Sequence, residues 1–151
     1  MPESAEEFYA RIAAATDDDG RLASGETGIP VTLFLEPRRH GDLADMSEER
    51  AAEMGRLLVV VAAAVEALPS VGRAHVCRWG DGSAHLHWWV MGRPARIPQL
   101  LGSFLPLWEE YLPRIPADVR NENVRFVVDR VVDAYGGVPG GAVPDATPDD
   151  G

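Results

Sequence analysis

Residues 84–93 read Ala-His-Leu-His-Trp-Trp-Val-Met-Gly-Arg and hold two of the four histidines of the chain. In a β-strand successive side chains point to opposite faces, so an extended conformation would place His85, His87 and Trp89 on one face. The two imidazoles would then lie about 7 Å apart along the strand. Such a pair can bind a metal, position an anion, or place a nucleophilic nitrogen beside a group that orients it.

The segment before this stretch predicts a hairpin. Residues 73–79 form a second candidate strand, and Gly-Asp-Gly-Ser at residues 80–83 connects the two. An Asp-Gly pair between strand-like runs is a strong signal for a two-residue turn. That turn would set three pairs of residues opposite one another: Trp79 and Ala84, Arg78 and His85, Val76 and His87. A bulge or an odd-length connection would reverse the faces.

The predicted pairing places the other polar residues of the two strands on different faces of the sheet. Arg78 would share the face of His85 and His87. His75 and Cys77 would lie on the opposite face, and we assign both of them to packing. They would therefore not join the other histidines in a four-ligand metal site.

The N-terminal half of the chain predicts two helices and one more strand. A capping box that begins at Ser4 precedes apolar residues at helical spacing, which predicts a helix over residues 5–16. A β-branched and aromatic run predicts a strand over residues 29–36. Ser47 as an N-cap, two acidic residues in the first turn and apolar residues at helical spacing predict a long helix over residues 48–68.

The C-terminal part of the chain predicts one helix and a tail. Residues 98–112 are expected to be irregular, with a helical turn near residues 107–111. A final helix is predicted over residues 117–135, where a Gly-Gly pair follows. Residues 136–151 are rich in Gly, Pro and Asp with little to bury, which predicts a disordered acidic tail. Residues 1–135 are thus expected to form a single α+β domain.

Composition excludes several classes of function. The chain has 151 residues and a formal net charge of −10, which opposes binding to duplex nucleic acid. No apolar stretch approaches the roughly 18–20 residues that span a bilayer, so we expect a cytoplasmic protein without a membrane segment. The lone Cys77 can form neither an internal disulfide nor a Cys-x-x-Cys zinc site. All 14 basic residues are arginine, which we read as a sign of an actinobacterial source.

The order of the predicted elements resembles the histidine triad (HIT) superfamily over residues 31–93. In that family a strand leads into a Pro-x-x-His loop, matched here by residues 37–40, and a long helix follows. The family signature is His-φ-His-φ-His-φ-φ, where φ is apolar, and residues 85–91 match its first two histidines. Arg93 matches an arginine that often follows the signature. The resemblance implies an antiparallel sheet flanked by helices, and a homodimer.

The resemblance also implies a covalent mechanism on a small-molecule nucleotide, without a cofactor. His87, the middle histidine, would attack the α-phosphorus of a nucleoside phosphate derivative and carry the nucleotidyl group until water or phosphate removes it. His85 and His40 would orient groups and stabilise charge. Neutral imidazole suits this role, because it is a good nucleophile near neutral pH. The chain would accordingly be a nucleotide hydrolase or a nucleotidyl transferase.

The sequence departs from the family pattern at two places. The third signature position is Trp89, and indole can donate one hydrogen bond but cannot accept one or carry a proton. Arg78 lies in the region where the family often has an asparagine, and the connection that follows is short. We expect Ser83 and Arg78 to contact the substrate phosphate, with Trp89 and Arg93 as further substrate-binding candidates.

Two alternatives to the enzyme remain open. The first is a catalytically inactive HIT-like module that binds a nucleotide or acts as an interaction protein, a hypothesis that Trp89 motivates. The second is a zinc site built from His40, His85 and His87, since imidazole is a common zinc ligand.

Overall fold

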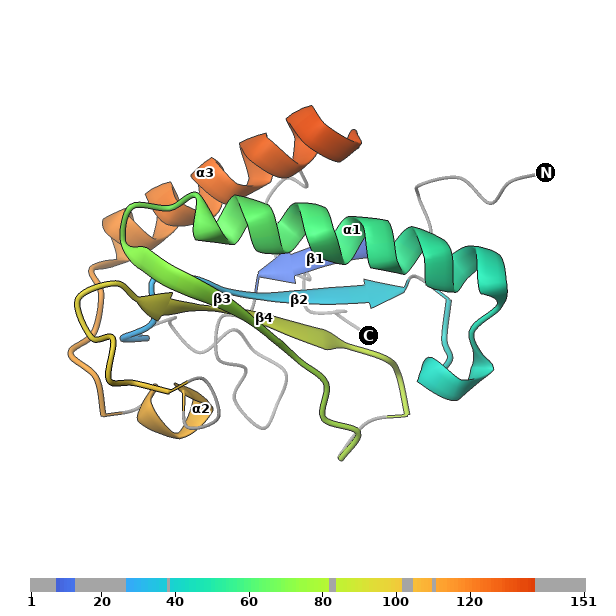
Figure 1. The fold of residues 1–151 in the computed structure, drawn as a ribbon, viewed down its shortest axis with the longest axis horizontal. Helices are drawn as coiled ribbons and strands as arrows, with labels where there is room; N and C mark the ends of the chain where they lie inside the picture. The colour runs from blue at the N-terminus through green and yellow to red at the C-terminus, as the bar shows by residue number, and fades with distance from the viewer. Residues whose placement is uncertain are drawn as a thin grey trace, which may run out of the picture.

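The protein is an α+β fold built on a four-stranded antiparallel sheet with the strand order β1-β2-β4-β3 (Figure 1). The computed structural model describes residues 8–12, 27–37, 39–81, 84–101, 105–109 and 111–137. Its elements are, in chain order, β1 (Phe8–Ile12), β2 (Thr32–Pro37), the 3-10 turn η2 (Leu43–Asp45), α1 (Glu48–Glu66), β3 (Val71–Cys77), β4 (Trp88–Pro94), α2 (Leu105–Trp108) and α3 (Ala117–Tyr135).

Helix α1 begins where the sequence predicts and covers one face of the sheet. The Ser47 side chain accepts a hydrogen bond from the Arg50 N–H at 3.4 Å, and two glutamates occupy the first turn. Its buried apolar residues recur every three or four positions, which places one stripe against the sheet. They are Met54, Leu57, Val61, Ala64 and Val65. Burying a side chain of the Val or Leu kind stabilises the fold by about 1.5–3 kcal/mol.

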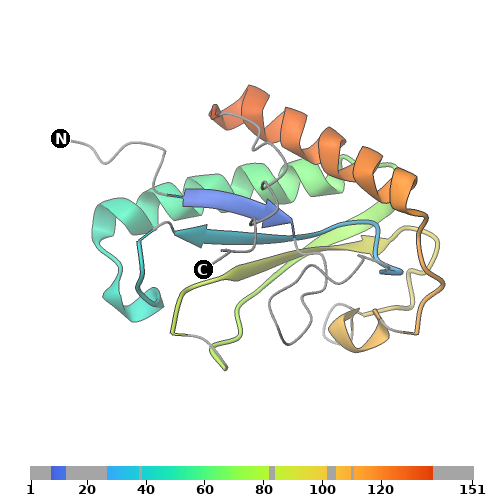
Figure 2. The same cartoon turned by 180° about the vertical axis from the view of Figure 1, so that it is seen from behind.

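Helix α3 has the predicted bounds and packs against α1 on the same side of the sheet (Figures 1 and 2). Gly136 follows it with a φ of 98°, a conformation that favours glycine. Between the helices the Tyr135 hydroxyl donates to Glu53 Oε1 at 2.6 Å. Burial, and then this carboxylate, raise the pKa of Tyr135 to about 12. The helix pair therefore encloses a polar contact as well as apolar side chains.

The sheet has an apolar core on each face. Leu33, Leu35 and Val90 belong to the larger core beneath α1 and α3. On the other face Met91 packs with Ile29, Leu100 and Leu105, where α2 lies. The predicted strand at residues 29–36 is present but begins at Thr32. The helical turn predicted near residues 107–111 is also present: α2 begins at Leu105, and the Tyr111 and Leu112 N–H groups donate to the Trp108 carbonyl.

The predicted helix over residues 5–16 is wrong for the part that the structure describes. Residues Phe8–Ile12 form β1, which pairs antiparallel with β2 from Phe8 opposite Pro37 to Ile12 opposite Leu33. The free edge of β2 offers a row of backbone donors and acceptors, and pairing with it satisfies both strands. The hydrogen bonds gained by pairing with β2 outweigh the local preference for a helix that the capping box predicts. The other residues of the predicted helix lie outside the described part of the chain.

The predicted two-residue turn between β3 and β4 is also wrong. Cys77 pairs with Trp89 and His75 pairs with Met91, so the strands are joined by the whole of residues 78–87. Residues 82–83 lie outside the described chain. This register reverses the predicted faces, because His75 and Cys77 now share a face with Trp89. The strand predicted from Ala84 begins only at Trp88, so His85 and His87 precede it.

The structure bears only partly on two further expectations, which concern membrane segments and the C-terminal tail. Within the described ranges no helix is long and apolar enough to cross a bilayer. Of the predicted tail, only Gly136 and Gly137 are described, and residues 138–151 lie outside.

Candidate functional site

The loop that follows β2 meets the connection between β3 and β4 at one end of the sheet. The Leu86 N–H donates to the Gly41 carbonyl at 2.9 Å. Next to this bond the rings of His40 and His85 stack, with centroids 5.4 Å apart and an interplanar angle of 20°. The Leu86 side chain is 1% exposed and belongs to the core beneath α1. The histidine segment is therefore anchored to the loop after β2 and not to β3.

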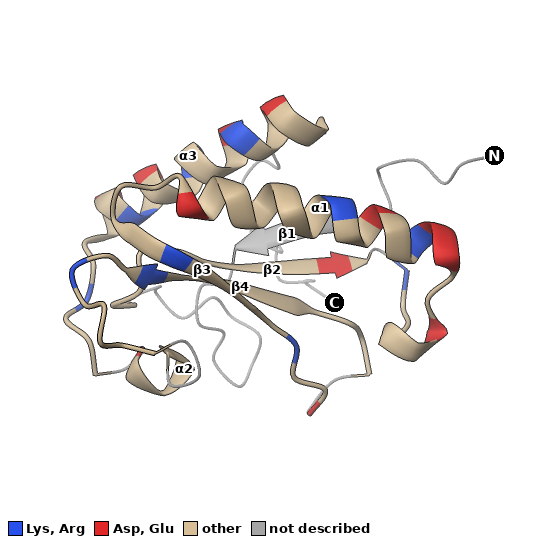
Figure 3. Ribbon diagram, viewed as in Figure 1, with Lys and Arg blue, Asp and Glu red and all other residues tan. Residues whose placement is uncertain are grey.

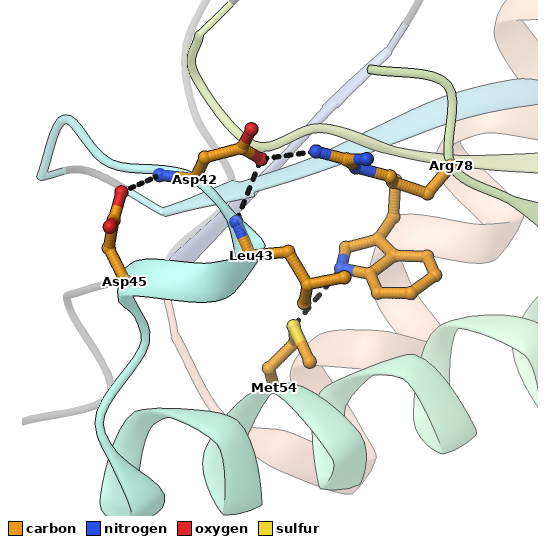
Figure 4. Close-up of polar contacts among 6 residues, drawn as sticks. Asp42, Leu43, Asp45, Met54 and Arg78 are labelled. Carbon is orange, nitrogen blue, oxygen red and sulfur yellow. Dashed lines mark hydrogen bonds and ion pairs between the residues drawn. The ribbon is translucent and has the colours of Figure 1, made fainter.

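The β3 side of the connection is bound to the same loop. Arg78 Nη2 donates to Asp42 Oδ1 at 2.5 Å, and the same oxygen accepts the Leu43 N–H at 2.7 Å (Figure 4). The Asp42 N–H in turn donates to Asp45 Oδ2 at 3.1 Å. The hydrogen bond from the Arg78 side chain, followed by that from the Leu43 N–H, lowers the pKa of Asp42.

These contacts explain why the tight hairpin does not form. Arg78 on one flank and Leu86 on the other each find partners in residues 41–42, about forty positions away in the chain. A two-residue turn would pair the flanks with each other and would leave Asp42 and the Gly41 carbonyl without these partners. These two hydrogen bonds, together with the burial of the Leu86 side chain, favour the long connection.

Trp88 and His87 leave this junction toward opposite faces of the sheet. The Trp88 indole Nε1 donates to the Met54 sulfur at 3.0 Å and so fixes the beginning of β4 to α1 (Figure 4). His87 instead contacts Phe34 and Trp89 edge-on, with centroids at 5.8 and 6.3 Å. His87 is thus on the face that α1 does not cover.

An aromatic cluster, formed by Phe34, Trp79 and Trp89, surrounds His87 on that face. Trp89 lies edge-on to Phe34 at 4.3 Å and to Trp79 at 5.5 Å, and Trp79 is 41% exposed. Within the described chain His87 Nδ1 and Trp89 Nε1 are buried and have no hydrogen-bond partner. Two ring nitrogens beside a partly exposed aromatic surface are suited to a ligand with a planar ring and polar atoms.

The structure brings together most of the residues that the sequence singled out. His40, His85, His87, Arg78 and Trp89 lie where the loop after β2 meets the beginning of β4. Ser83 lies outside the described residues.

Arg93 is not brought to this junction. It lies five positions beyond Trp88 along β4, a span of about 16 Å at the usual strand rise. It pairs with Arg73 of β3 instead.

Sequence reasoning missed Asp42, Phe34 and Trp79. Asp42 and Asp45 form a capping box around η2, and the spacing of two acidic residues before a helical turn could have revealed it. The role of Asp42 as the partner of Arg78 has no local signal, because 36 positions separate them. Phe34 joins the site through the register of the sheet, opposite Trp89, and Trp79 joins it through an edge-on contact with the Trp89 ring.

The described residues give the zinc hypothesis no support. Among them, no three His, Cys, Asp or Glu side chains lie where they could hold one metal ion. His40 and His85 meet face to face, an arrangement in which the two rings contact each other through their planes. Metal ligation requires nitrogen lone pairs in the ring planes to converge on one point.

Comparisons with known proteins support the fold. No protein-family profile matches the sequence, and no curated protein matches it. Among solved structures the chain is similar to the crystal structure of a Hit-like protein involved in cell-cycle regulation from Bartonella henselae, determined with an unknown ligand. The TM-score is 0.55 at 12% identity, over 85% of this chain and 84% of the other. The expected α+β HIT-like fold is thereby confirmed.

Proposed function

We propose that this chain binds a nucleotide and hydrolyses or transfers its nucleotidyl group at the α-phosphorus, with His87 as the nucleophile. The observation that carries the proposal is the junction of the loop after β2 with the beginning of β4, where the His40 and His85 rings stack and His87 follows two residues later, against Trp89. The HIT-like fold supports it, because the resemblance to that superfamily implies a histidine nucleophile on a fold of this kind.

The proposed reaction has two displacements. A ring nitrogen of His87 forms a bond to the α-phosphorus while the bond from phosphorus to the leaving group breaks. Water or phosphate then attacks the phosphorus, and the bond to His87 breaks. Each step is easier than one direct displacement, because the imidazole is both a good nucleophile and a good leaving group when protonated.

The neighbouring residues are assigned supporting roles. Arg78, held by Asp42, supplies positive charge near the phosphate, and Ser83 contacts the same group. His40 and His85 stabilise charge, and Trp89 contributes its indole N–H and its ring to substrate binding. No cofactor is needed.

A second candidate is a HIT-like module with a degenerate triad that binds a nucleotide without turning it over. Trp89 favours it, because the indole occupies the third signature position and packs at 4.3 Å against Phe34. In addition, no described residue bonds His87 Nδ1, whereas a nucleophilic histidine is usually oriented through its second nitrogen.

The experiment that separates the two is turnover of adenosine and guanosine phosphates and phosphoramidates. The enzyme predicts that His87→Ala lowers turnover by about 10³-fold or more, as loss of a nucleophile does. Tyr111→Ala, which removes a 78% exposed ring elsewhere, is the control and should leave turnover unchanged. Turnover that His87→Ala does not alter would contradict the mechanism. Calorimetric binding without turnover would select the second candidate, and activity gained in Trp89→His would show that the triad is degenerate at this position.

The resemblance extends the proposal to the assembly and its setting. We propose a homodimer in the cytoplasm whose domain spans residues 1–135, with the remaining residues as a tail. The single cysteine supports a reducing compartment. The absence of lysine supports an actinobacterial source.

A further inference from the structure

Two arginines face each other at the opposite end of the β3 and β4 pair. Arg73 and Arg93 are register partners, and blue bands lie on neighbouring parts of β3 and β4 (Figure 3). Because directly opposite residues of paired strands point to the same face, the two arginine side chains lie on one face. His75 is two residues farther along β3 and points to the same face, about 7 Å from Arg73 and diagonal to Arg93. A chain with a net charge of −10 thus concentrates three basic side chains on one small area.

The charges in this basic cluster, defined as Arg73, His75 and Arg93, are poorly compensated. Glu66 Oε1 lies 3.6 Å from Arg73 Nη1, but the Arg73 side chain is 65% exposed and the pair is weak in water. No ion pair joins Arg93 to another described residue, and like charges directly opposite in a sheet are destabilising. The arrangement therefore works against the stability of the free protein.

Two nitrogens of the basic cluster are buried without a partner. Among the described residues, neither Arg93 Nε nor His75 Nε2 has a hydrogen-bond partner. Leaving a buried polar group unsatisfied is costly, and native proteins usually resolve it with an ordered water, an ion or a ligand. The orphaned atoms belong to two neighbouring strands and to the same face of the sheet.

The backbone around the basic cluster makes room for the Arg93 guanidinium. A Cβ on Gly72 would approach Arg93 Nη2 to 3.1 Å and Nε to 3.7 Å, so the bare glycine backbone borders the guanidinium. The register between the strands also shifts between Val71 and Arg73, as at a β-bulge. Bulges often re-aim side chains next to functional sites. The arginine pair therefore lies next to the register shift between Val71 and Arg73 and not within a regular strand ladder.

We propose that Arg73, His75 and Arg93 form a binding site for a small phosphate-bearing anion, separate from the junction that holds His87. Two guanidinium groups match a phosphate dianion in charge, and their planar forks match its oxygens in geometry. An Nε2–H tautomer of His75 supplies a further donor. The bound phosphate offsets the repulsion between the two arginines. This site stands independently of the function proposed for His87.

The test follows the His75 ring by proton–carbon NMR while inorganic phosphate is added at constant ionic strength. Burial, and then the positive charges of Arg93 and Arg73, lower the pKa of His75, whereas Glu66 opposes them. We expect a saturable shift of the His75 signals and a rise of the His75 pKa when phosphate binds, because the anion offsets both arginines. No saturable response at millimolar phosphate would overturn the site.

Matched variants assign the response to the basic cluster. Arg93→Gln should weaken phosphate binding about tenfold through loss of a charged hydrogen-bond partner, and the exposed Arg73→Gln should weaken it as well. Arg125→Gln, the same change on the exposed surface of α3, should have no effect. His87→Asn should keep the His75 response, which separates this site from the other junction. Equal affinity in the wild type and in Arg93→Gln or Arg73→Gln would contradict the proposal.

Discussion

The two ends of the β3 and β4 pair are built from the same two strands but are stabilised in different ways. At the end where β4 begins, the strands separate and each binds the loop after β2, through Arg78 with Asp42 and through Leu86 with Gly41. At the end where β4 finishes, the strands stay paired through a shifted register and set Arg73 opposite Arg93.

The difference between the ends shows that one part of a sheet can be stabilised by contacts within the protein while another part keeps charges available for a ligand. We call the end where β4 begins the histidine end and the end where β4 finishes the arginine end. The histidine end is held by hydrogen bonds to the loop after β2 and by the burial of Leu86, so the stacked rings of His40 and His85 are positioned without a ligand. Both ends keep buried nitrogens without a partner among the described residues, but only the arginine end also sets like charges opposite each other. The arginine end therefore gives up additional stability that a bound anion could restore.

The largest expected effect lies at the histidine end. Leu86→Ala should lower the free energy of unfolding by about 2–5 kcal/mol, because it removes a side chain that is 1% exposed and leaves a cavity beneath α1. Urea unfolding followed by circular dichroism measures it. The matched change Leu101→Ala, at a 59% exposed position, should cost less than about 0.5 kcal/mol. Similar losses in both variants would mean that Leu86 does not anchor the connection.

A smaller effect depends on pH. The pKa of Asp42 is lower in the folded protein than in the unfolded chain, so its contribution to stability is complete above about pH 4. That contribution is lost as the pH falls through the folded-state pKa. The stability gap between the wild type and Asp42→Asn should therefore narrow when urea unfolding is repeated at about pH 3.

The exposed Asp129→Asn on α3 serves as the control for this experiment. Its gap from the wild type should change little over the same range, since no ion pair joins Asp129 to another described residue. A gap for Asp42→Asn that stays constant with pH would show that the contact with Arg78 does not stabilise the fold.

The smallest expected change concerns the arginine end. Without phosphate, Arg93→Met should leave the stability unchanged or raise it by up to about 1 kcal/mol, because it removes a like charge opposite Arg73. Thermal unfolding in a phosphate-free buffer measures it. Added phosphate should then raise the melting temperature of the wild type but not that of Arg93→Met. A clear loss of stability in the phosphate-free buffer would show that Arg93 has a structural role at this end.

Much of the candidate site could be predicted from local sequence, but its arrangement could not. The alternation of histidine and apolar residues, together with the Pro-x-x-His loop, is enough to single out His40, His85 and His87. Their faces were predicted wrongly, since the Asp-Gly pair indicated a tight turn. A two-residue turn and the observed register differ by an odd shift, and such a shift exchanges the two faces of a strand.

The sequence by itself determined the two long helices, because a 3.6-residue apolar period and a boundary residue, Ser47 before α1 and Gly136 after α3, are local properties of the chain. It also determined which residue types could carry chemistry. Only the tertiary structure decided that Phe8–Ile12 is a strand, that residues 78–87 open toward Asp42, and that Arg93 lies far from His87. The physical reason is that strand pairing is satisfied by partners dozens of residues away, whose backbone groups no local pattern encodes.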